Sequence, residues 1–425
     1  MGSQQFDVTV IGAGMAGLVC AQQLQQAGYS VVVVEKSRGA GGRMATRRVS
    51  GTRVDHGLRY LEPKGKFLQQ LINYLERKKN GLSSQHILQL WTDKIYELIQ
   101  PQRLILPITK DCYIAPQGMN SVGKFLAQNL EVWFSRRVET MQATVEKNWH
   151  LSLEITNDVA TEKPIEVISK AVVVAIPAPQ ALMILDKPVA ETPPEFLNNL
   201  RLVEYDPCIT VMAGYSPALQ ENLPEWRAIA FPDDDYLAWV GVDSSKRPHS
   251  TQPVFVIQSN AKFATTHLDT TNLQPVGQEL LEYTAQQLMP WLKSPEWLQV
   301  HPWRYAFCRQ PLAVSCLTTE LPLPLVGTGD WCGGVNEVRS QKSEAVRPRD
   351  DASRKGTRTK RVRSDFCNGN LSNPPKTFGL KRRGVKLNYF DNVESAFASG
   401  LAAASWVNSK LQNLLLPGES FLREI

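Results

Sequence analysis

The chain has 425 residues, of which 43% are hydrophobic and 21% charged, and its formal net charge is +6 at pH 7. This is the balance of a globular chain, long enough for two domains with sizeable cores. No basic stretch precedes the first apolar run, and that run soon ends in glycines, so we expect neither a signal peptide nor a membrane span.

Seven cysteines are present, and they form no CxxC pair. An odd number without such spacing is typical of thiols in a reducing compartment, which predicts a cytoplasmic protein. The six histidines are scattered, and none has ligand spacing to a cysteine or an acid, so we expect no metal site.

The first 35 residues have the pattern of a nucleotide-binding unit. The strand FDVTVIGAG is followed by a glycine-rich turn, a helix and a second strand, YSVVVVE, that ends at Glu35. Glycines at these spacings allow a sharp turn, close approach of the backbone to a pyrophosphate, and close packing of helix on strand. Glu35 is placed to accept hydrogen bonds from an adenosine ribose. The predicted cradle consists of Gly12, Ala13, Gly14, Met15, Ala16 and Gly17.

The next segment, SRGAGGRMATRR, places glycines and arginines directly after the ribose carboxylate. A second backbone approach and fixed cations there would suit a bound diphosphate. The segment resembles the GG motif of FAD-containing amine oxidases, and a late stretch, LPLPLVGTGDWCGG, resembles the strand of that family that ends in Gly-Asp. The resemblance favours FAD over NAD and adds Lys36, Gly42, Arg43, Met44, Gly329 and Asp330 to the expected cofactor-binding residues.

The remaining pattern predicts two domains. The run from Ala171 to Ile176 is short, β-branched and continuous, as expected for a strand buried on both faces. CITVMAGY, YLAWVGVD and PVFVIQSNA are typical of antiparallel strands, and KFLQQLINYLERKK and QELLEYTAQQLMPWL of helices. We assign residues 1–75, 110–178, 301–335 and 392–418 to a discontinuous cofactor domain, and 76–109 and 179–300 to a substrate domain.

Residues 336–391 hold fifteen Lys or Arg and six Asp or Glu, and lack helical or strand periodicity. Such a composition predicts a disordered or weakly ordered segment. It interrupts the late motif just before a helix near Val393, so we interpret it as an insertion. Its basic blocks leave a nucleic-acid or acidic-partner tether open, although no aromatic platform is interleaved with the charges, which makes nucleic acid an unfavoured partner.

Several motifs together resemble the renalase-type branch of flavoprotein oxidases, namely EKSRGAGGRMATRR, DHG, YIAPQGMNSV, AIPAPQA, WRYA and GDWCGG. The resemblance implies an α/β fold: a Rossmann-like FAD-binding domain of the glutathione-reductase or hydroxylase kind, with a second α+β domain built on a mainly antiparallel sheet. The implied activity is oxidation of isomeric dihydronicotinamide dinucleotides, with electrons passing to molecular oxygen and release of hydrogen peroxide.

The resemblance also suggests residues around the flavin ring. Trp303 and Tyr205 would border its face, with Trp239 as a further candidate, and Arg59 would bind the flavin or an anionic substrate. Arg304 is a second candidate cation. By family position, the other contacts would come from His56, Gly57 and Tyr60 and from the backbone of Val138.

Three functions remain open: a flavin oxidase of reduced nicotinamide isomers, an amine oxidase acting on primary or secondary amines, and a flavoprotein-like scaffold without catalysis. Amines would favour an aromatic sandwich without phosphate-binding cations. A dinucleotide substrate would need basic groups, and Arg59 and Arg304 favour that reading. Cys332, beside the Gly-Asp motif, could be a covalent flavin link or a redox thiol, but a packed thiol is the simpler interpretation.

Overall fold

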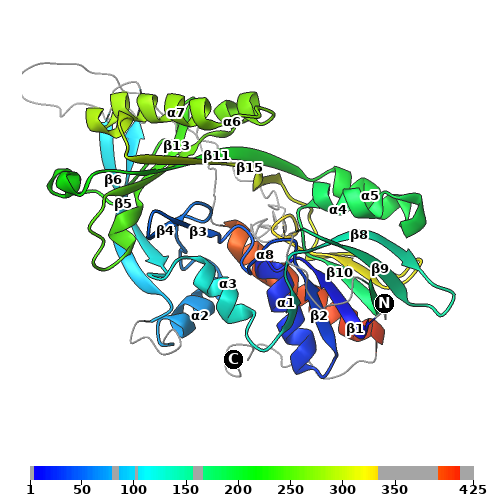
Figure 1. The fold of residues 1–425 in the computed structure, drawn as a ribbon. Helices are drawn as coiled ribbons and strands as arrows, with labels where there is room; N and C mark the ends of the chain where they lie inside the picture. The colour runs from blue at the N-terminus through cyan, green and yellow to red at the C-terminus, as the bar shows by residue number, and fades with distance from the viewer. Residues whose placement is uncertain (1–3, 79–85, 101–103, 157–165, 334–390, 412–425) are drawn as a thin grey trace, which may run out of the picture. The chain divides into compact units, whose positions relative to one another are not determined.

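The computed structural model describes residues 4–78, 86–100, 104–156, 166–333 and 391–411. The described residues form an 8-stranded sheet, a 7-stranded sheet, a two-stranded hairpin and helices packed on them (Figure 1). The expected basic insertion, residues 336–391, lies outside the described residues apart from Asp391. Among the described helices, none is both long and apolar enough to cross a bilayer.

The first sheet is the nucleotide-binding type that the N-terminal pattern predicts. Its central order is β16-β17-β10-β1-β2-β7, and β1 pairs in parallel with both β2 and β10. The strands are β1 (Gln4–Ile11), β2 (Val31–Val34), β7 (Glu131–Trp133), β10 (Glu166–Val174), β16 (Leu317–Thr319) and β17 (Leu325–Gly327), with β8 (Arg136–Ala143) and β9 (Trp149–Ile155) joined through β10.

Strand β10 is buried on both faces, as its continuous apolar run predicts. Ala171 and Val173 belong to the core beneath helix α1 (Met15–Gln26), whereas Val172 and Val174 belong to the core that contains Trp133. Successive side chains of a strand point to opposite faces, so each face of the sheet needs its own apolar cover.

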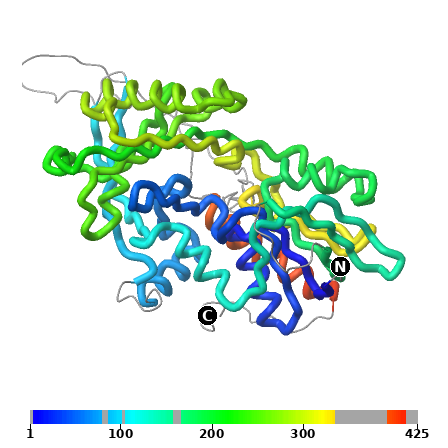
Figure 2. The backbone as a smooth tube through the Cα atoms, in the orientation of Figure 1, coloured from blue at the N-terminus to red at the C-terminus, as the bar shows by residue number. Residues whose placement is uncertain are grey.

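The two ends of the described chain build this domain together. Helix α8 (Asp391–Leu411) packs along α1, and Figure 2 shows the orange-red and blue segments side by side. The contact is close, because a Cβ on Gly400 would lie 2.4 Å from the carbonyl oxygen of Ala16. A larger residue at position 400 would push the two helices apart.

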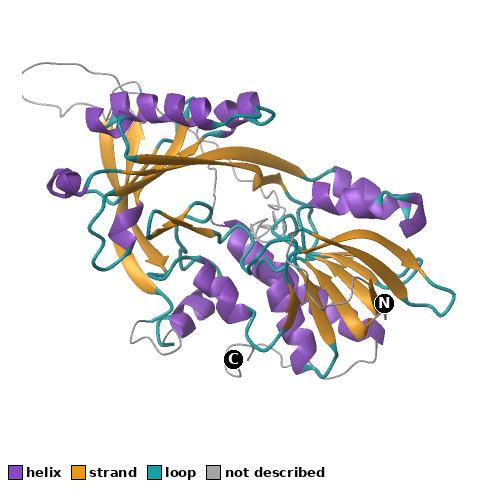
Figure 3. Ribbon diagram, in the orientation of Figure 1, coloured by secondary structure: helices purple, strands orange, loops and turns teal. Residues whose placement is uncertain are grey.

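The second sheet has the order β15-β11-β14-β13-β12-β5-β6 and is antiparallel except where β12 pairs with β5. Helices α6 (Ala261–His267) and α7 (Gln274–Gln287) cover one face (Figure 3). Its strands are β5 (Gln89–Ile99), β6 (Leu104–Ile114), β11 (Glu204–Gly214), β12 (Ala228–Ala230), β13 (Leu237–Val242), β14 (Val254–Ser259) and β15 (Trp297–Gln310). Strands β6 and β15 each cross one of the predicted domain limits, and those limits remain a prediction.

A small hairpin connects the two sheets. It consists of β3 (Thr46–Val49) and β4 (Thr52–Asp55) and follows the glycine- and arginine-rich segment directly. The remaining helices are α2 (Lys66–Leu75), α3 (Asn120–Leu126), α4 (Ala178–Leu185) and α5 (Pro194–Arg201), with the 3-10 turns η1 (Pro188–Ala190), η2 (Pro217–Asn222), η3 (Asp243–Lys246) and η4 (Pro290–Lys293).

Candidate functional site

The turn after β1 has the backbone that a pyrophosphate cradle needs. Gly12 has φ +106°, and a Cβ there would lie 2.8 Å from the carbonyl oxygen of Ala175. A Cβ on Gly17 would lie 2.1 Å from the Gly12 carbonyl oxygen, so only glycine lets α1 sit this close to its strand. Gly14 faces open space instead, with no atom within 4 Å of a Cβ placed there. A ligand could therefore approach the backbone at Gly14.

The second glycine-rich segment lies against this turn. The Gly41 N–H donates to the Ala13 carbonyl oxygen at 2.8 Å. Gly42 has φ +54°, and a Cβ on it would lie 3.3 Å from the Gly14 Cα. Both glycine-rich segments therefore border the space in front of Gly14.

Glu35 lies where β2 ends and is only 7% exposed. Its carboxylate accepts hydrogen bonds from the backbone N–H groups of Ala13, at 2.7 Å, and Ser37, at 2.8 Å. The acid therefore ties the end of the second strand to the glycine turn. Lys36 is exposed beside it, whereas Met15, Ala16 and Met44 are buried beneath the cradle.

Arg43 and Asp330 form a two-point ion pair between the early and the late motif. Arg43 Nη1 donates to Asp330 Oδ2 at 2.7 Å, and Nη2 donates to Oδ1 at 2.6 Å. Asp330 is 3% exposed and follows Gly329, whose φ is +158°. Burial opposes the charge of Arg43, but the Asp330 carboxylate outweighs burial and raises the pKa of the guanidinium. The guanidinium of Arg43 is therefore charged at any ordinary pH.

The loop after β4 packs on Arg43. The Leu58 N–H donates to the Arg43 carbonyl oxygen at 2.9 Å, and a Cβ on Gly57 would lie 2.0 Å from that same oxygen. Trp303 of β15 closes the other side, because its Nε1–H donates to the His56 carbonyl oxygen at 2.9 Å. The structure thus brings together the early loop and the predicted pocket tryptophan.

Three aromatic rings gather at this point. His56 is stacked on Trp303 with ring centroids 5.2 Å apart, and His301 meets both rings edge-on at 4.8 and 4.5 Å. Burial, then His301 and Arg47, lower the pKa of His56 to about 3. Burial and Arg47 lower the pKa of His301 to about 4. Both imidazoles are therefore neutral near pH 7.

Arg59 is buried at 7% exposure, a few residues along the same loop. Its Nε donates to the Gln258 side-chain oxygen at 2.6 Å, and Gln258 Nε2 donates back to the Gly57 carbonyl oxygen at 2.8 Å. The guanidinium also lies 4.9 Å from the Trp239 ring centroid, a cation–π distance. A cation is thus held in a fixed orientation beside the loop of His56 and Gly57.

Tyr205 and Tyr60 occupy different surroundings. Tyr205, at the start of β11, meets Tyr305 edge-on at 5.7 Å, and burial together with Asp330 raises its pKa well above the ordinary value. Its phenol is therefore neutral and near the ion pair. Tyr60 is fully buried, with Trp239 at 5.5 Å and Trp91 at 6.4 Å, so it supports the loop from within the core.

Other predicted candidates lie apart from this cluster. Arg304 is half exposed and forms a surface ion pair with Asp269, Nη2 to Oδ1 at 2.9 Å, so it does not reinforce Arg59. Val138 is buried in β8, next to an irregularity in the pairing with β9. Cys332 is fully buried and burial raises its pKa to about 12, which fits a packed thiol rather than a reactive one. Within the described ranges no three His, Cys, Asp or Glu side chains could hold a metal ion.

Two parts of this arrangement have no signal in the sequence. Gln258 and His301 lie on strands of the second sheet, far in sequence from the loop they contact, and neither belongs to a motif. Asp55 lies within the DHG motif, but its buried partners Asp243, Lys246 and Arg247 come from one turn almost 200 residues later. Only the DHG motif itself could have drawn attention to this cluster.

Comparison with known proteins agrees with this geometry. Residues 10–75 match the NAD(P)-binding Rossmann-like domain. The chain is 44% identical to AofH of Mycobacterium tuberculosis, which is named as a flavin-containing monoamine oxidase, over a segment of 57 residues. This segment is 13% of each chain. It is 30% identical to the L-amino acid oxidase of Bothrops pictus over 141 residues. This segment is 32% of this chain and 27% of that protein. The matched segments thus span less than a third of these relatives.

Solved structures extend the likeness to the whole fold. A single-substitution variant of putrescine oxidase has a TM-score of 0.61 at 13% identity, covering 96% of this chain and 100% of that one. Cyclohexylamine oxidase from Brevibacterium oxydans IH-35A has a TM-score of 0.60 at 11% identity, covering 96% and 99%. The N-terminal part of the chain is thus similar in sequence to flavin-containing amine and amino acid oxidases, and the chain as a whole shares the α/β fold of solved amine oxidases.

Proposed function

We propose that this protein is an FAD-dependent oxidase that removes hydride from a small amine or amino acid and passes the electrons to molecular oxygen. The observation that carries the proposal is the meeting of the two motifs, because Arg43 pairs with Asp330 and the adjacent Gly42 lies against the open turn at Gly14. Relatives named as monoamine and L-amino acid oxidases, and neighbours named as putrescine and cyclohexylamine oxidases, support this substrate class.

The residues present fit FAD. Glu35 is at the strand end where an adenosine ribose would lie, and the open backbone of Gly14 and Gly42 suits the diphosphate. Arg43 would neutralise the diphosphate, and Asp330 would accept hydrogen bonds from the ribityl chain. Bound there, the flavin would supply the acceptor for a hydride, which carries both electrons of the oxidation.

The protein's own part is orientation and exclusion of water. The stacked rings of His56 and Trp303 form an aromatic wall, and the Trp303 N–H fixes this wall to the loop. The neutral imidazoles leave the wall uncharged, which suits close packing of a flat group. Arg59, held by Gln258, would bind the carboxylate of an amino acid substrate.

A second candidate is oxidation of isomeric dihydronicotinamide dinucleotides, the activity implied by the resemblance to the renalase-type branch. Arg59 supports it too, because a buried cation could equally bind a phosphate. The surface pairing of Arg304 with Asp269 weakens it, since the second expected phosphate ligand is engaged elsewhere.

One experiment separates these readings. The purified protein is mixed anaerobically with a panel of L-amino acids, with benzylamine and putrescine, and with borohydride-reduced NAD, while flavin absorbance is followed near 450 nm. Rapid bleaching by an amine or amino acid, with peroxide formed on admission of air, is the expected result. Bleaching by reduced NAD alone would overturn the amine proposal, and a protein that cannot be loaded with flavin would overturn both.

A further inference from the structure

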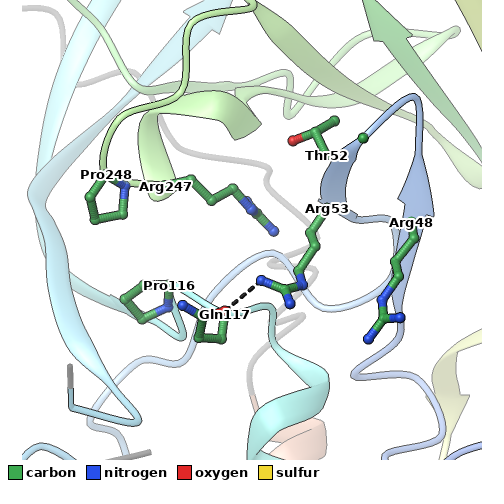
Figure 4. A pocket seen from close by; sticks show the side chains of 8 residues that line it. Arg48, Thr52, Arg53, Pro116, Gln117, Arg247 and Pro248 are labelled. Atoms are coloured by element: carbon green, nitrogen blue, oxygen red, sulfur yellow. Dashed lines mark hydrogen bonds between the residues drawn. The ribbon is translucent and has the colours of Figure 1, made fainter. Parts of the chain in front are cut away.

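A cavity of about 530 Å³ opens between the β3–β4 hairpin, the turn at Pro116 and Gln117, and the segment that follows η3. Arg48, Arg53 and Arg247 line it, and Figure 4 shows the guanidinium groups of Arg53 and Arg247 directed toward the same space. Its size is in the range of pockets that bind small ligands.

Two of these arginines occupy directly opposite positions on the two strands of the hairpin. Arg48 and Arg53 are direct partners in the register of β3 and β4, so their side chains share one face. Like charges directly opposite destabilise a strand pair. Among the described residues neither has a carboxylate partner, and Arg53 donates only to the Gln117 side-chain oxygen. The hairpin therefore carries an uncompensated pair of charges.

A third cation adds to the same potential. Lys124 of α3 is exposed, and burial, followed by repulsion from Arg48 and Arg53, lowers its pKa. No carboxylate among the described residues pairs with Lys124. Three positive side chains therefore act on this region without a counter-charge from the described part of the chain.

Arg247 forms the opposite wall and is already neutralised. It pairs with Asp55 at 2.9 Å and with Asp243 at 2.8 Å, and Lys246 reaches the same two carboxylates at 3.5 and 3.0 Å. This buried network fixes Arg247 at the edge of the cavity. It contributes a rigid surface rather than excess charge.

The cavity is separate from the proposed flavin site. Neighbouring residues of a strand point to opposite faces, so Arg47 leaves the cavity and reaches Gln299, Nη1 to Oε1 at 3.4 Å, near His301. Arg48 and Arg53 point the other way. The hairpin thus presents one arginine to the proposed catalytic side and two to the cavity.

We propose that this cavity binds a small oxyanion ligand, with phosphate or carboxylate groups held by Arg48 and Arg53. The planar guanidinium fork suits either group. A bound anion would relieve the repulsion across the hairpin. The site is independent of the flavin and of the substrate proposed above.

The test measures anion binding by calorimetry on the flavin-loaded protein at constant ionic strength. The probes are inorganic pyrophosphate for the phosphate source and citrate for the carboxylate source, with chloride as the blank. Arg48→Gln and Arg53→Gln are each expected to weaken binding of the preferred probe at least tenfold. Arg137→Gln, an exposed arginine paired with Glu154, is the matched control and should leave binding unchanged.

Binding of either probe that depends on both arginines supports the site and identifies its source. If neither probe binds more tightly than chloride, or if the double variant Arg48→Gln/Arg53→Gln binds as well as the unaltered protein, the proposal is wrong. Flavin absorbance and circular dichroism of each variant show that the fold is intact, so a loss of binding cannot be assigned to misfolding.

Discussion

Arg43 and Asp330 are 287 positions apart in the chain, yet they make two charge-assisted hydrogen bonds. Asp330 is almost fully buried, whereas the Arg43 side chain is about one-third exposed (34%). The pair therefore joins the early glycine segment to the late strand motif.

Replacing Asp330 with Asn should destabilise the flavin-free protein by about 2 kcal/mol, because the buried side chain would lose its charge and one of the two acceptors that bind Arg43. The free energy of unfolding in urea measures this change. Asp186→Asn removes a half-exposed pair with Arg201 and should cost under about 0.5 kcal/mol. Equal effects of the two changes would contradict the structural role of the buried pair.

Glu35→Gln should weaken FAD binding about tenfold or more, since the ribose would lose a charged acceptor and the amide would face the N–H groups of Ala13 and Ser37. The ratio of absorbance at 450 and 280 nm after dialysis against dilute FAD reports occupancy. Glu146→Gln, in an exposed turn, is the control. Full occupancy in Glu35→Gln would remove Glu35 from the cofactor site.

Gly57→Ala should yield a protein with little bound flavin, because its Cβ would lie 2.0 Å from the Arg43 carbonyl oxygen and the loop must move. Gly39→Ala is a close control, since no atom lies within 4 Å of a Cβ there and its φ is not in the left-handed region. We expect normal flavin content in Gly39→Ala. The same content in Gly57→Ala would show that the loop adapts without consequence for the cofactor.

The loss of stability in acid should depend on buried His56 and partly buried His301. The pKa of histidine in an unfolded chain is about 6.5, whereas the folded-state pKa values are about 3 for His56 and about 4 for His301. Between these limits only the unfolded chain takes up the protons, so stability is fully present above the unfolded pKa and falls as the pH decreases. The melting temperature of His301→Phe should therefore fall less between pH 7.5 and pH 5 than that of the unaltered protein.

The exposed residue His249 provides the control for this measurement. His249→Gln should keep the pH dependence of the unaltered protein. An identical pH dependence in His301→Phe would mean that other groups govern the acid transition.

The parts of the fold that follow from local pattern were predicted well. Each of these parts depends on residues within one short segment. They are the glycine turn, the buried strand at Ala171 and the strands of the second sheet. Helix α2 was expected to run to residue 79, and it ends at Leu75. Helix ends are set by local capping and packing that apolar spacing does not contain.

Pairings across the chain were not predictable in the same way. Nothing near Arg304 shows that it meets Asp269 at the surface, and nothing near Arg59 shows that it meets Gln258. Of the arginines after the glycine segment, Arg43 was expected at the cofactor, and nothing in the sequence shows that Arg47 and Arg48 point to opposite faces of a hairpin. Such contacts depend on how the sheets pack, which no short motif encodes.

The junction on either side of residues 334–390 is compact. A Cβ on Gly333 would lie 3.5 Å from the Ser395 Cβ, and Glu394 accepts hydrogen bonds from the backbone N–H groups of Phe67 and Leu68. Replacing residues 336–389 with a short Gly-Ser linker should therefore leave flavin content unchanged and reduce retention on heparin. A colourless product would contradict the interpretation of this segment as a passive insertion.

The packing of α8 on α1 also affects the order in which the protein folds during synthesis. During synthesis the first strands and helix leave the ribosome long before residues 391–411, so Ala16 can contact Gly400 only after the residues between them have been synthesised. Contacts so distant in sequence form late and slowly. We therefore expect stable binding of the coenzyme only after α8 has been synthesised, and nascent chains arrested before α8 should remain dependent on chaperones.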